Sequence, residues 1–543
     1  LTIENEEETK SGKFYDPVKR RHHLVVLPKT NRGIQKAMHL VSRGYLEGFF
    51  RFPRVDYKML REAGKDDDLI ISSACLGGPF AYEIFKHMQQ VEFYNLHPDL
   101  LDRPGMADKV LNDMGNVLDQ LSWAVGLKNV FLELQFNKLS AQHLVNKALL
   151  MFAKKHNLQN QLVVTCDSHY SRPDHWKERE LYKKLGWLNY KDFNPENMPS
   201  KKEDLKCELY PKNADQVWDS YIETTKEYPE IYDDKLVVDA IERTYDIAHD
   251  VIDNNMSVDT SMKLPSYVIP KDMSPDKALL EACKKGLVSR GKHTDQAYID
   301  RLKMELTVIR KKGFSAYFLT MKKMLDIARR EMFVGPGRGS GAGSLVAWTL
   351  YITDMDPIEY GLLFERFLSI HRKGYPDIDT DVGDRDRLIQ MLRDEFSAEN
   401  VIPISNYNTF KLKTLVKDIS RFYGIPFEES NNALKTVEND VISAIRGPGF
   451  NRGTFVLEYK DALEHSAKFR DFIEKYPMIS EPINVLFKQN KALGRHAGGV
   501  IVSENIAERM PLIRAKGEAQ TPWTEGMTSQ LEKFGWIKFD LLG

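Results

Sequence analysis

Residues 334–381 read VGPGRGSGAGSLVAWTLYITDMDPIEYGLLFERFLSIHRKGYPDIDTD, and this stretch decides the fold. It begins with a glycine-dense turn at 335–344, followed by an apolar segment at 345–350 that we expect to open a helix. Glycines let backbone N–H groups approach an anion closely, and the N-terminus of a following helix adds its dipole. Arg338 adds a forked donor that suits phosphate. A flexible surface turn is the alternative, but the polar residues within the run favour phosphate binding.

The same stretch ends in an acidic run with period 2, Asp377-Ile378-Asp379-Thr380-Asp381. On a strand, the three aspartates would share one face and Ile378 would point to the other. Carboxylates on one face repel each other and are costly to bury unpaired, so we expect a cation there. Carboxylates with substrate phosphates are a usual Mg²⁺ environment, and two such ions can clamp the oxygens of a phosphoryl transfer. A solvated edge strand is the alternative.

Together these motifs resemble the palm of bacterial C-family replicative DNA polymerases, of the DNA polymerase III alpha subunit type. In that family a GPGRGS-AGSLVA turn precedes LLFERFL and then a PDxDxD strand, and all three stand here in that order. The resemblance implies that Asp377 and Asp379 carry two catalytic Mg²⁺ ions. It also implies a set of residues that hold the triphosphate of the incoming dNTP: Gly337, Arg338, Gly339, Ser340 and Arg366.

The segment at 536–540, WIKFD, is similar to the V-K-F-D strand of the family. On a strand, Lys538 and Asp540 would share one face while Ile537 and Phe539 share the other. The resemblance implies that Asp540 is the third catalytic carboxylate. It also implies that Lys538 neutralises charge on the phosphates or on the carboxylates.

Residues 263–333 predict a connector and three helices that lead to the glycine turn. Ser274-Pro275 predicts a helix start, with serine as N-cap and proline after it. The next helix is expected from about Tyr298, with an apolar stripe of Leu302, Met304, Leu306 and Ile309. The segment KGFSAYFL at 312–319 resembles the GFxGYFL entry into the palm of the family.

Residues 410–423, FKLKTLVKDISRFY, predict an amphipathic helix. Its apolar stripe would be Leu412, Leu415, Val416, Ile419 and Phe422, and its basic stripe Lys413, Lys417 and Arg421. A basic stripe suits a helix that follows a phosphate backbone, and a solubilising lysine face is the alternative. Its position resembles the thumb of the family, which favours DNA. Residues 494–502, GRHAGGVIV, resemble the KHAGGVVI return to the palm, so Arg495 and His496 are further DNA-binding candidates.

The region up to residue 262 alternates short apolar strands with helices, which predicts an α/β layer or barrel. It resembles the polymerase-and-histidinol-phosphatase (PHP) domain that opens C-family polymerases. The resemblance gives His23, Cys75, Asp167 and His169 as ligands of Zn²⁺ or Mn²⁺. However, the family begins with a His-x-His motif, and this chain contains none. Ordinary polar side chains at strand ends are the alternative for His23 and His169.

The composition limits the classes of protein to which this chain can belong. The chain has 543 residues, 42% hydrophobic and 29% charged, which predicts a soluble protein of three or four domains. It shows no bilayer-spanning run and no signal peptide, so we expect a cytoplasmic protein without a membrane partner. The net charge of −1 means that nucleic acid would be met by local basic patches. Four widely spaced cysteines indicate reduced thiols.

The fold class that we expect is α/β and multidomain. It would comprise a partial PHP-type barrel (1–262), a nucleotidyltransferase-like palm with a mixed sheet in two parts (263–405 and 491–543), and a mostly helical thumb (406–490). The function implied is template-directed DNA synthesis, in which a primer 3′ hydroxyl attacks the α-phosphate of a dNTP. The partners implied are primer-template DNA and dNTPs.

The chain begins at Leu1 and ends within an apparent strand, which predicts one piece of a longer or split polymerase. A C-terminal chain would then supply the fingers and give access to a sliding clamp. Two other function classes stay open. One is a PHP-type phosphoesterase or 3′–5′ exonuclease, and the other is a catalytically inert fragment.

Overall fold

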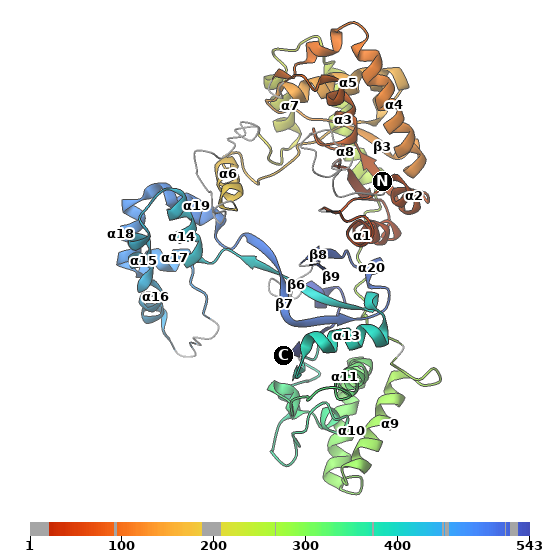
Figure 1. Cartoon of the computed structure of the whole chain (residues 1–543), viewed down its shortest axis with the longest axis vertical. Coiled ribbons are helices and arrows are strands. Elements are labelled where there is room, and N and C mark those ends of the chain that lie inside the picture. Colours follow the sequence, from red (N-terminus) through yellow and green to blue (C-terminus); the bar gives the residue numbers. More distant parts are fainter. Residues whose placement is uncertain are drawn as a thin grey trace. The chain divides into compact units, whose positions relative to one another are not determined.

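The computed structural model describes residues 21–50, 52–91, 95–186, 208–266, 268–371, 374–447, 450, 455–515, 517–521 and 530–543. These residues form a mixed α/β structure (Figure 1). The chain divides into two compact units. Unit 1 contains Leu1–Thr30, Leu60–Asn255 and Asn408–Ala492, and unit 2 contains Asn31–Met59, Met256–Tyr407 and Leu493–Gly543.

The N-terminal part of unit 1 is a four-stranded sheet in the order β1-β2-β3-β4. β1 is antiparallel to β2, whereas β2, β3 and β4 are parallel. The parallel strands are buried throughout and apolar except for Ser72 and Glu133, as expected of strands covered by helices. The elements are β1 (Val25–Pro28), β2 (Leu69–Ser72), β3 (Val130–Leu134), β4 (Leu162–Val164), α2 (Tyr57–Gly64), α3 (Pro79–Phe85), α4 (Met106–Val125), α5 (Ser140–His156), α7 (Ala214–Thr224), α8 (Asp234–Asp246) and a π-helical turn (Ile247–Val251).

The second part of unit 1 is helical. Its elements are α14 (Leu412–Phe422), α15 (Phe427–Lys435), α16 (Val437–Ile445), α17 (Tyr459–His465), α18 (Ala467–Lys475) and α19 (Ser480–Leu486). The apolar stripe predicted for α14 is confirmed, because Leu415, Val416 and Ile419 are fully buried. Helix α6 (Trp176–Leu185) also packs here, through Leu181 and Leu185. Part of the range predicted as PHP-like therefore contributes to the helical core.

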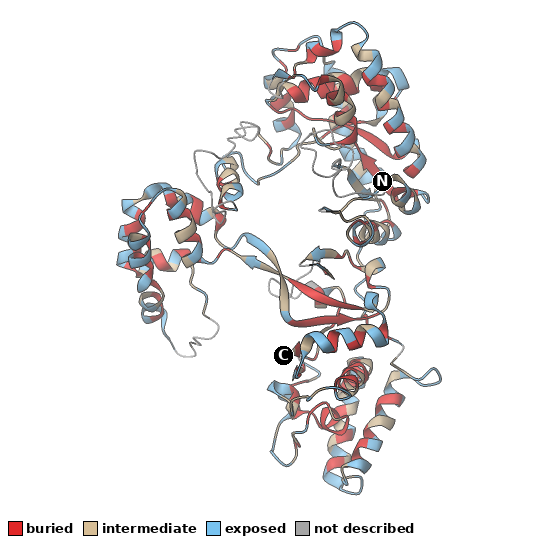
Figure 2. Cartoon of the chain, in the orientation of Figure 1, coloured by how far each residue is buried: buried red, intermediate tan, exposed pale blue. Residues whose placement is uncertain are grey.

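Unit 2 is organised by a sheet in the order β5-β10-β7-β6, which contains β5 (Asp379–Asp381), β10 (Lys538–Leu542), β7 (Asn490–Val502) and β6 (Val401–Thr409). β10 is parallel to β5 and antiparallel to β7. Figure 2 shows the buried parts of β6 and β7 of this sheet in red. Phe539 and Leu541 on β10 enter a hydrophobic core, so the predicted alternation along this strand is confirmed. Helices that contribute to the same core are α9 (Pro275–Ser289), α10 (Gln296–Lys311), α11 (Ser315–Ala328), α12 (Leu345–Thr349) and α13 (Arg385–Phe396).

Helix α1 (Asn31–Leu46) belongs to unit 2, although it lies in the range predicted as PHP-like. It packs against α20 (Ile506–Arg509), close to the small hairpin of β8 (Ile513–Ala515) and β9 (Glu518–Gln520). Buried Ser42 fixes this contact, because its hydroxyl donates to the Met510 carbonyl and accepts from the Leu512 N–H. The remaining helix, α21, spans Gln530–Lys533.

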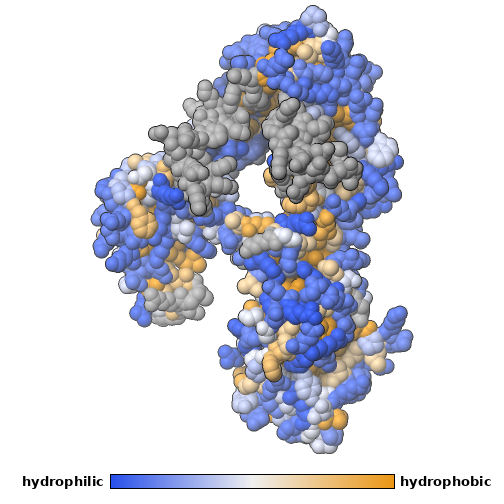
Figure 3. All heavy atoms as spheres, viewed as in Figure 1, coloured by the Kyte–Doolittle hydropathy of each residue, from blue (hydrophilic) through white to orange (hydrophobic). Residues whose placement is uncertain are grey.

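The face of the molecule seen in Figure 3 is mostly hydrophilic, with scattered apolar side chains. In the part of the chain that the structure describes, none of the helices combines the length and the apolar character that a bilayer crossing requires.

Candidate metal and nucleotide site

Two neighbouring strands of unit 2 bring three carboxylates together. Asp540 on β10 lies directly opposite Asp379 on β5, and Asp377 precedes β5 by two residues. One carboxylate oxygen from each residue lies within 4.8 Å of the others. Among the described residues, this is the one group of three or more His, Cys, Asp or Glu side chains that could hold a metal ion. The three acids expected from the sequence are therefore adjacent.

The charge and hydrogen bonding of this group fit a divalent cation. Asp540 is only 6% exposed, and its Oδ1 has no hydrogen-bond partner. Its Oδ2 accepts from Lys538, whose Nζ also lies 3.8 Å from Asp377 Oδ1. One ammonium offsets only part of three carboxylate charges, and a buried oxygen without a partner is unfavourable. Oxygen-only ligands of this kind are what Mg²⁺ prefers.

The last aspartate of the acidic run has a different partner. Asp381 Oδ1 accepts from Arg338 at 2.8 Å, and both side chains are about half exposed, at 54% and 50%. Such an exposed pair contributes little stability. The pair does, however, occupy the Arg338 guanidinium that we expected to bind phosphates. To bind a phosphate, Arg338 would have to give up its contact with Asp381.

The glycine turn lies directly against β5. The Gly335 N–H donates to the Asp381 carbonyl at 2.8 Å, and Val334 bridges to Val382. Gly339 has φ +64°, and a Cβ there would lie 3.5 Å from Asp379 Oδ2. The missing side chain therefore keeps the space beside the carboxylates open, and Gly339 and Ser340 are exposed there.

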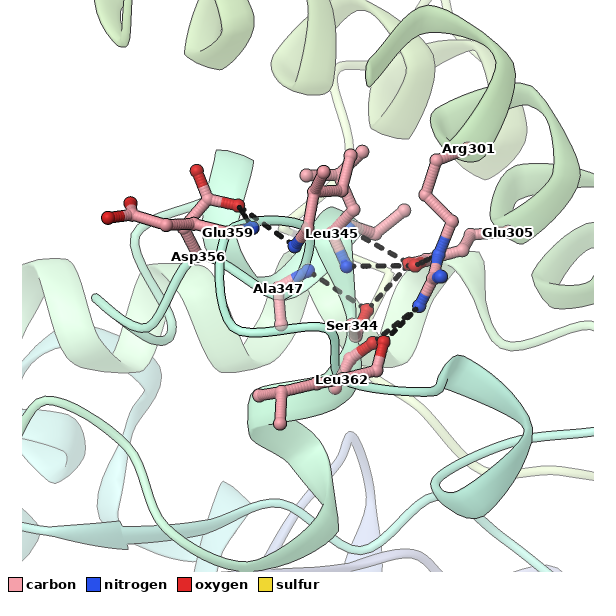
Figure 4. Close-up of polar contacts among 11 residues, drawn as sticks. Arg301, Glu305, Ser344, Leu345, Ala347, Asp356, Glu359 and Leu362 are labelled. Carbon is pink, nitrogen blue, oxygen red and sulfur yellow. Dashed lines mark hydrogen bonds and ion pairs between the residues drawn. The ribbon is translucent and has the colours of Figure 1, made fainter. Parts of the chain in front are cut away.

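The start of α12 does not present free N–H groups to an anion, which corrects the expectation from the sequence. The N–H groups of Leu345 and Val346 donate to the carboxylate of Glu305, at 2.9 and 3.0 Å (Figure 4). Ser344 also donates to Glu305 and caps Ala347. The protein thus supplies its own anion at this helix end. Backbone N–H groups that contact a phosphate would then have to come from the preceding glycine turn, which includes the 3₁₀ turn Gly339–Gly343.

Arg301 joins this buried network and connects it to the segment that carries Arg366. Its Nε donates to Glu305 at 2.7 Å, and its Nη2 lies 3.0 Å from the Gly343 carbonyl and 3.2 Å from the Leu362 carbonyl. Arg366 follows in the 3₁₀ turn Phe364–Arg366, which contacts the Gly339–Gly343 turn, and its side chain is exposed. Burial raises the pKa of Glu305.

On β7, two predicted DNA-binding residues hold the local structure. Arg495 lies 3.2 Å from Asp386 and 3.4 Å from Glu518. His496 Nδ1 accepts from the N–H groups of Gly498 and Gly499, at 3.2 and 2.8 Å. Gly499 lies opposite Asp540 in the strand register, so this turn borders the carboxylates.

Tyr317, on α11, was quoted within a motif at the sequence level but given no role. It is fully buried, and its hydroxyl accepts from the Ile378 N–H at 3.2 Å. Its ring stacks on Phe539, with centroids 5.3 Å apart and planes 10° apart. Burial, and then the neighbouring carboxylates, raise the pKa of Tyr317 well above its usual range, so the hydroxyl stays neutral.

Two family models match parts of this chain. Residues 277–543 match the model of the bacterial DNA polymerase III alpha NTPase domain, and residues 3–137 match the PHP domain. The chain is 30% identical to the DNA polymerase III subunit alpha of Aquifex aeolicus, over 97% of this chain and 44% of that protein. The corresponding subunit of Borreliella burgdorferi is also 30% identical, over 98% of this chain and 42% of that protein.

The chain belongs to the bacterial DNA polymerase III alpha subunit family. It spans less than half the length of these curated relatives.

In this polymerase III alpha family member, the basic stripe of α14 makes contacts within its own helical region. Lys413 pairs with Glu438 at 2.6 Å, and both side chains are 42% exposed. Lys417 donates to Asn431 at 3.0 Å and lies over the Phe427 ring, whereas Arg421 is exposed. The stripe exists as predicted. Two of its three cations contact neighbouring side chains of the helical region.

The structure brings three of the four predicted ligands of the PHP region to one cavity and leaves the fourth outside it. His23 Nδ1 lies 3.3 Å from Cys75 Sγ, while His169 Nδ1 lies 2.6 Å from the backbone carbonyl of Asp167. His23, Cys75 and Asp167 line a cavity of about 520 Å³, and His169 is not among its lining residues. Burial raises the pKa of Cys75, which favours a neutral thiol over a metal-binding thiolate.

Glu133, which the sequence analysis did not single out, lines this cavity and is 4% exposed. Its Oε1 accepts from the Ser72 hydroxyl and the Ala74 N–H, and its Oε2 from Thr165 and Gln135. Both oxygens are thus satisfied by neutral donors. Its position at alternate spacing in the apolar run of β3 could have identified it as a carboxylate facing a site.

Proposed function

We propose that this chain carries the nucleotidyl-transfer centre of a DNA polymerase that extends a primer on a DNA template. The observation that supports this most is the juxtaposition of Asp377, Asp379 and Asp540, with one buried oxygen of Asp540 lacking a partner. A glycine turn borders the same carboxylates. Metal-binding carboxylates beside a phosphate-binding turn are what phosphoryl transfer requires.

In this proposal the three carboxylates hold two Mg²⁺ ions. Bound there, the ions would supply positive charge to the pentacoordinate phosphorus of the transition state and to the leaving pyrophosphate. The protein positions the reactants. The triphosphate would lie along Gly337, Gly339 and Ser340, with Arg338, Arg366 and Lys538 as its cations. The Lys538 ammonium would move from Asp540 and Asp377 to phosphate oxygens once metal ions neutralise those carboxylates.

We assign the palm to residues 263–405 and 491–543, the thumb to 406–490 and a PHP-like domain to 1–262. The thumb and the returning strand would meet the DNA backbone through Lys413, Lys417, Arg421, Arg495 and His496. Because four of these five side chains are engaged within the protein, DNA would have to compete with those contacts. Binding should therefore be strongly salt-dependent.

The experiment that tests the activity is primer extension with Mg²⁺ and dNTPs. The chain is assayed alone and together with a polypeptide that corresponds to the remaining C-terminal length of its relatives, which we propose carries the fingers and the route to a sliding clamp. We expect extension in the mixture and its loss in Asp379→Ala. Absence of extension in both samples, with primer shortening instead, would contradict a polymerase and favour an exonuclease.

We do not extend the proposal to a PHP-type phosphoesterase with Zn²⁺ or Mn²⁺. In the described part of the N-terminal region, no three potential ligands come together, and Glu133 is satisfied by neutral donors.

A further inference from the structure

We infer that Tyr317 is a positioning residue that holds the three carboxylates in register for metal binding. This inference rests on the proposed function, since it concerns the geometry of the same site. Tyr317 contacts both strands that carry the carboxylates. Its hydroxyl bonds the Ile378 N–H, between Asp377 and Asp379, and its ring stacks on Phe539, next to Asp540.

The hydrogen bond to Ile378 lies outside the paired part of the sheet. β5 begins at Asp379, and its paired register with β10 runs from Asp379 to Asp381. Asp377 and Ile378 thus precede the regular ladder. Ile378 is itself buried, at 4% exposed, and a buried N–H requires an acceptor. The Tyr317 hydroxyl supplies one and thereby fixes the peptide that links the two aspartates.

The contact to Phe539 fixes the other strand. Tyr317 and Phe539 are fully buried in the same core, and their rings are nearly parallel. Because side chains alternate along β10, Phe539 and Asp540 lie on opposite faces of the sheet. The ring therefore limits how far β10 can shift relative to β5. A shift of that kind would separate Asp540 from its opposite residue, Asp379.

The test is the Mn²⁺ affinity of the chain, measured by electron paramagnetic resonance of free Mn²⁺. Tyr317→Phe keeps the ring and removes only the hydroxyl, and we expect it to weaken Mn²⁺ binding by about 10- to 100-fold, as loss of a ligand-orienting group does. The matched control is Tyr298→Phe. Tyr298 lies in the same core, and its buried hydroxyl donates to Asp356 at 2.8 Å. This control should lose similar stability and keep the wild-type Mn²⁺ affinity.

The outcomes separate this inference from the proposed function. Wild-type Mn²⁺ affinity in Tyr317→Phe, together with weak binding in Asp379→Asn, would overturn the role of Tyr317 and leave the metal site intact. Equal binding in wild type and Asp379→Asn would overturn the metal site itself. If Tyr317→Phe does not fold, Phe539→Leu decides. Weaker Mn²⁺ binding in a folded Phe539→Leu protein supports the inference, and unchanged binding overturns it.

Discussion

Two clusters of polar side chains, one in each unit, differ in how their carboxylates are satisfied. In unit 2, Asp540 keeps a buried oxygen without a partner, and one ammonium faces three carboxylates. In unit 1, both oxygens of Glu133 accept from neutral donors. We therefore propose a cation for the first cluster, whereas the second is satisfied by neutral donors. Hydrogen-bond satisfaction, more than the presence of acidic residues, separates a metal site from a structural carboxylate.

The largest effect should come from Asp379→Asn. It removes one of three charges that hold the ion, so Mn²⁺ affinity should fall by more than about 100-fold, beyond the loss typical of an orienting group. The free energy of unfolding without metal should stay the same or rise, because repulsion among the carboxylates decreases. Isothermal titration with Mn²⁺ and urea unfolding measure the two quantities. A protein that keeps its Mn²⁺ affinity would remove the distinction between the clusters.

Acid should weaken the N-terminal part of unit 1 without any metal. Burial lowers the pKa of His143 from 6.5 to about 4, and its nitrogens contact Tyr232 and the Asn137 carbonyl. The unfolded chain binds the proton first as pH falls. The contribution of neutral His143 to the free energy of unfolding is therefore complete above pH 6.5 and is lost between pH 6.5 and 4. The loss should approach about 3 kcal/mol.

Hydrogen-exchange protection of α5 at pH 7.5 and pH 5 measures this loss. The control is His143→Gln, which cannot titrate and should flatten the pH dependence. The same slope in wild type and His143→Gln would assign the acid sensitivity to other groups.

Glu133→Gln tests the buried carboxylate of unit 1, which we expect to need no metal. The new amide donates hydrogens toward groups that already donate, so we expect a loss of about 1–3 kcal/mol in unfolding free energy. The stoichiometry and affinity of Mn²⁺ binding should not change. Chemical denaturation and Mn²⁺ titration of the same protein provide both values. A drop in Mn²⁺ stoichiometry would show that the cavity holds metal after all.

The smallest effect should come from alanine at two glycines with positive φ. One lies beside the carboxylates and the other has open space around its Cβ, so the pair separates backbone strain from crowding of the site. Gly339 and Gly361 have φ +64° and +62°, so alanine at either position should cost about 1 kcal/mol. Only at Gly339 would the new methyl group approach Asp379, since nothing lies within 4 Å of a Cβ at Gly361. Gly339→Ala should therefore weaken metal or dNTP binding, and Gly361→Ala should not. Equal binding in both variants would place the glycine turn outside the site.

The sequence allowed the strands and their faces to be predicted where alternation is strict. Phe539 and Asp540 point to opposite faces as expected, and the three aspartates converge although Asp540 is distant in sequence. Convergence was predictable only through the family resemblance, because periodicity does not give strand order. The phosphate role of the α12 start was wrong, since Glu305 on α10 already occupies it.

Glu305 was missed because it interrupts an apolar stripe. The buried positions of α10 are Tyr298, Leu302, Glu305 and Ile309, whereas the predicted stripe residues Met304 and Leu306 are only partly buried. A charged residue at core spacing is a usable signal for a buried network. Its partners, the N–H groups of Leu345 and Val346, could not be identified without the fold.

The most direct test of the central claim is anomalous diffraction from crystals of this chain soaked in Mn²⁺. The account predicts a peak among Asp377, Asp379 and Asp540 and no peak beside Glu133. A peak beside Glu133, or none among the three aspartates, would contradict it.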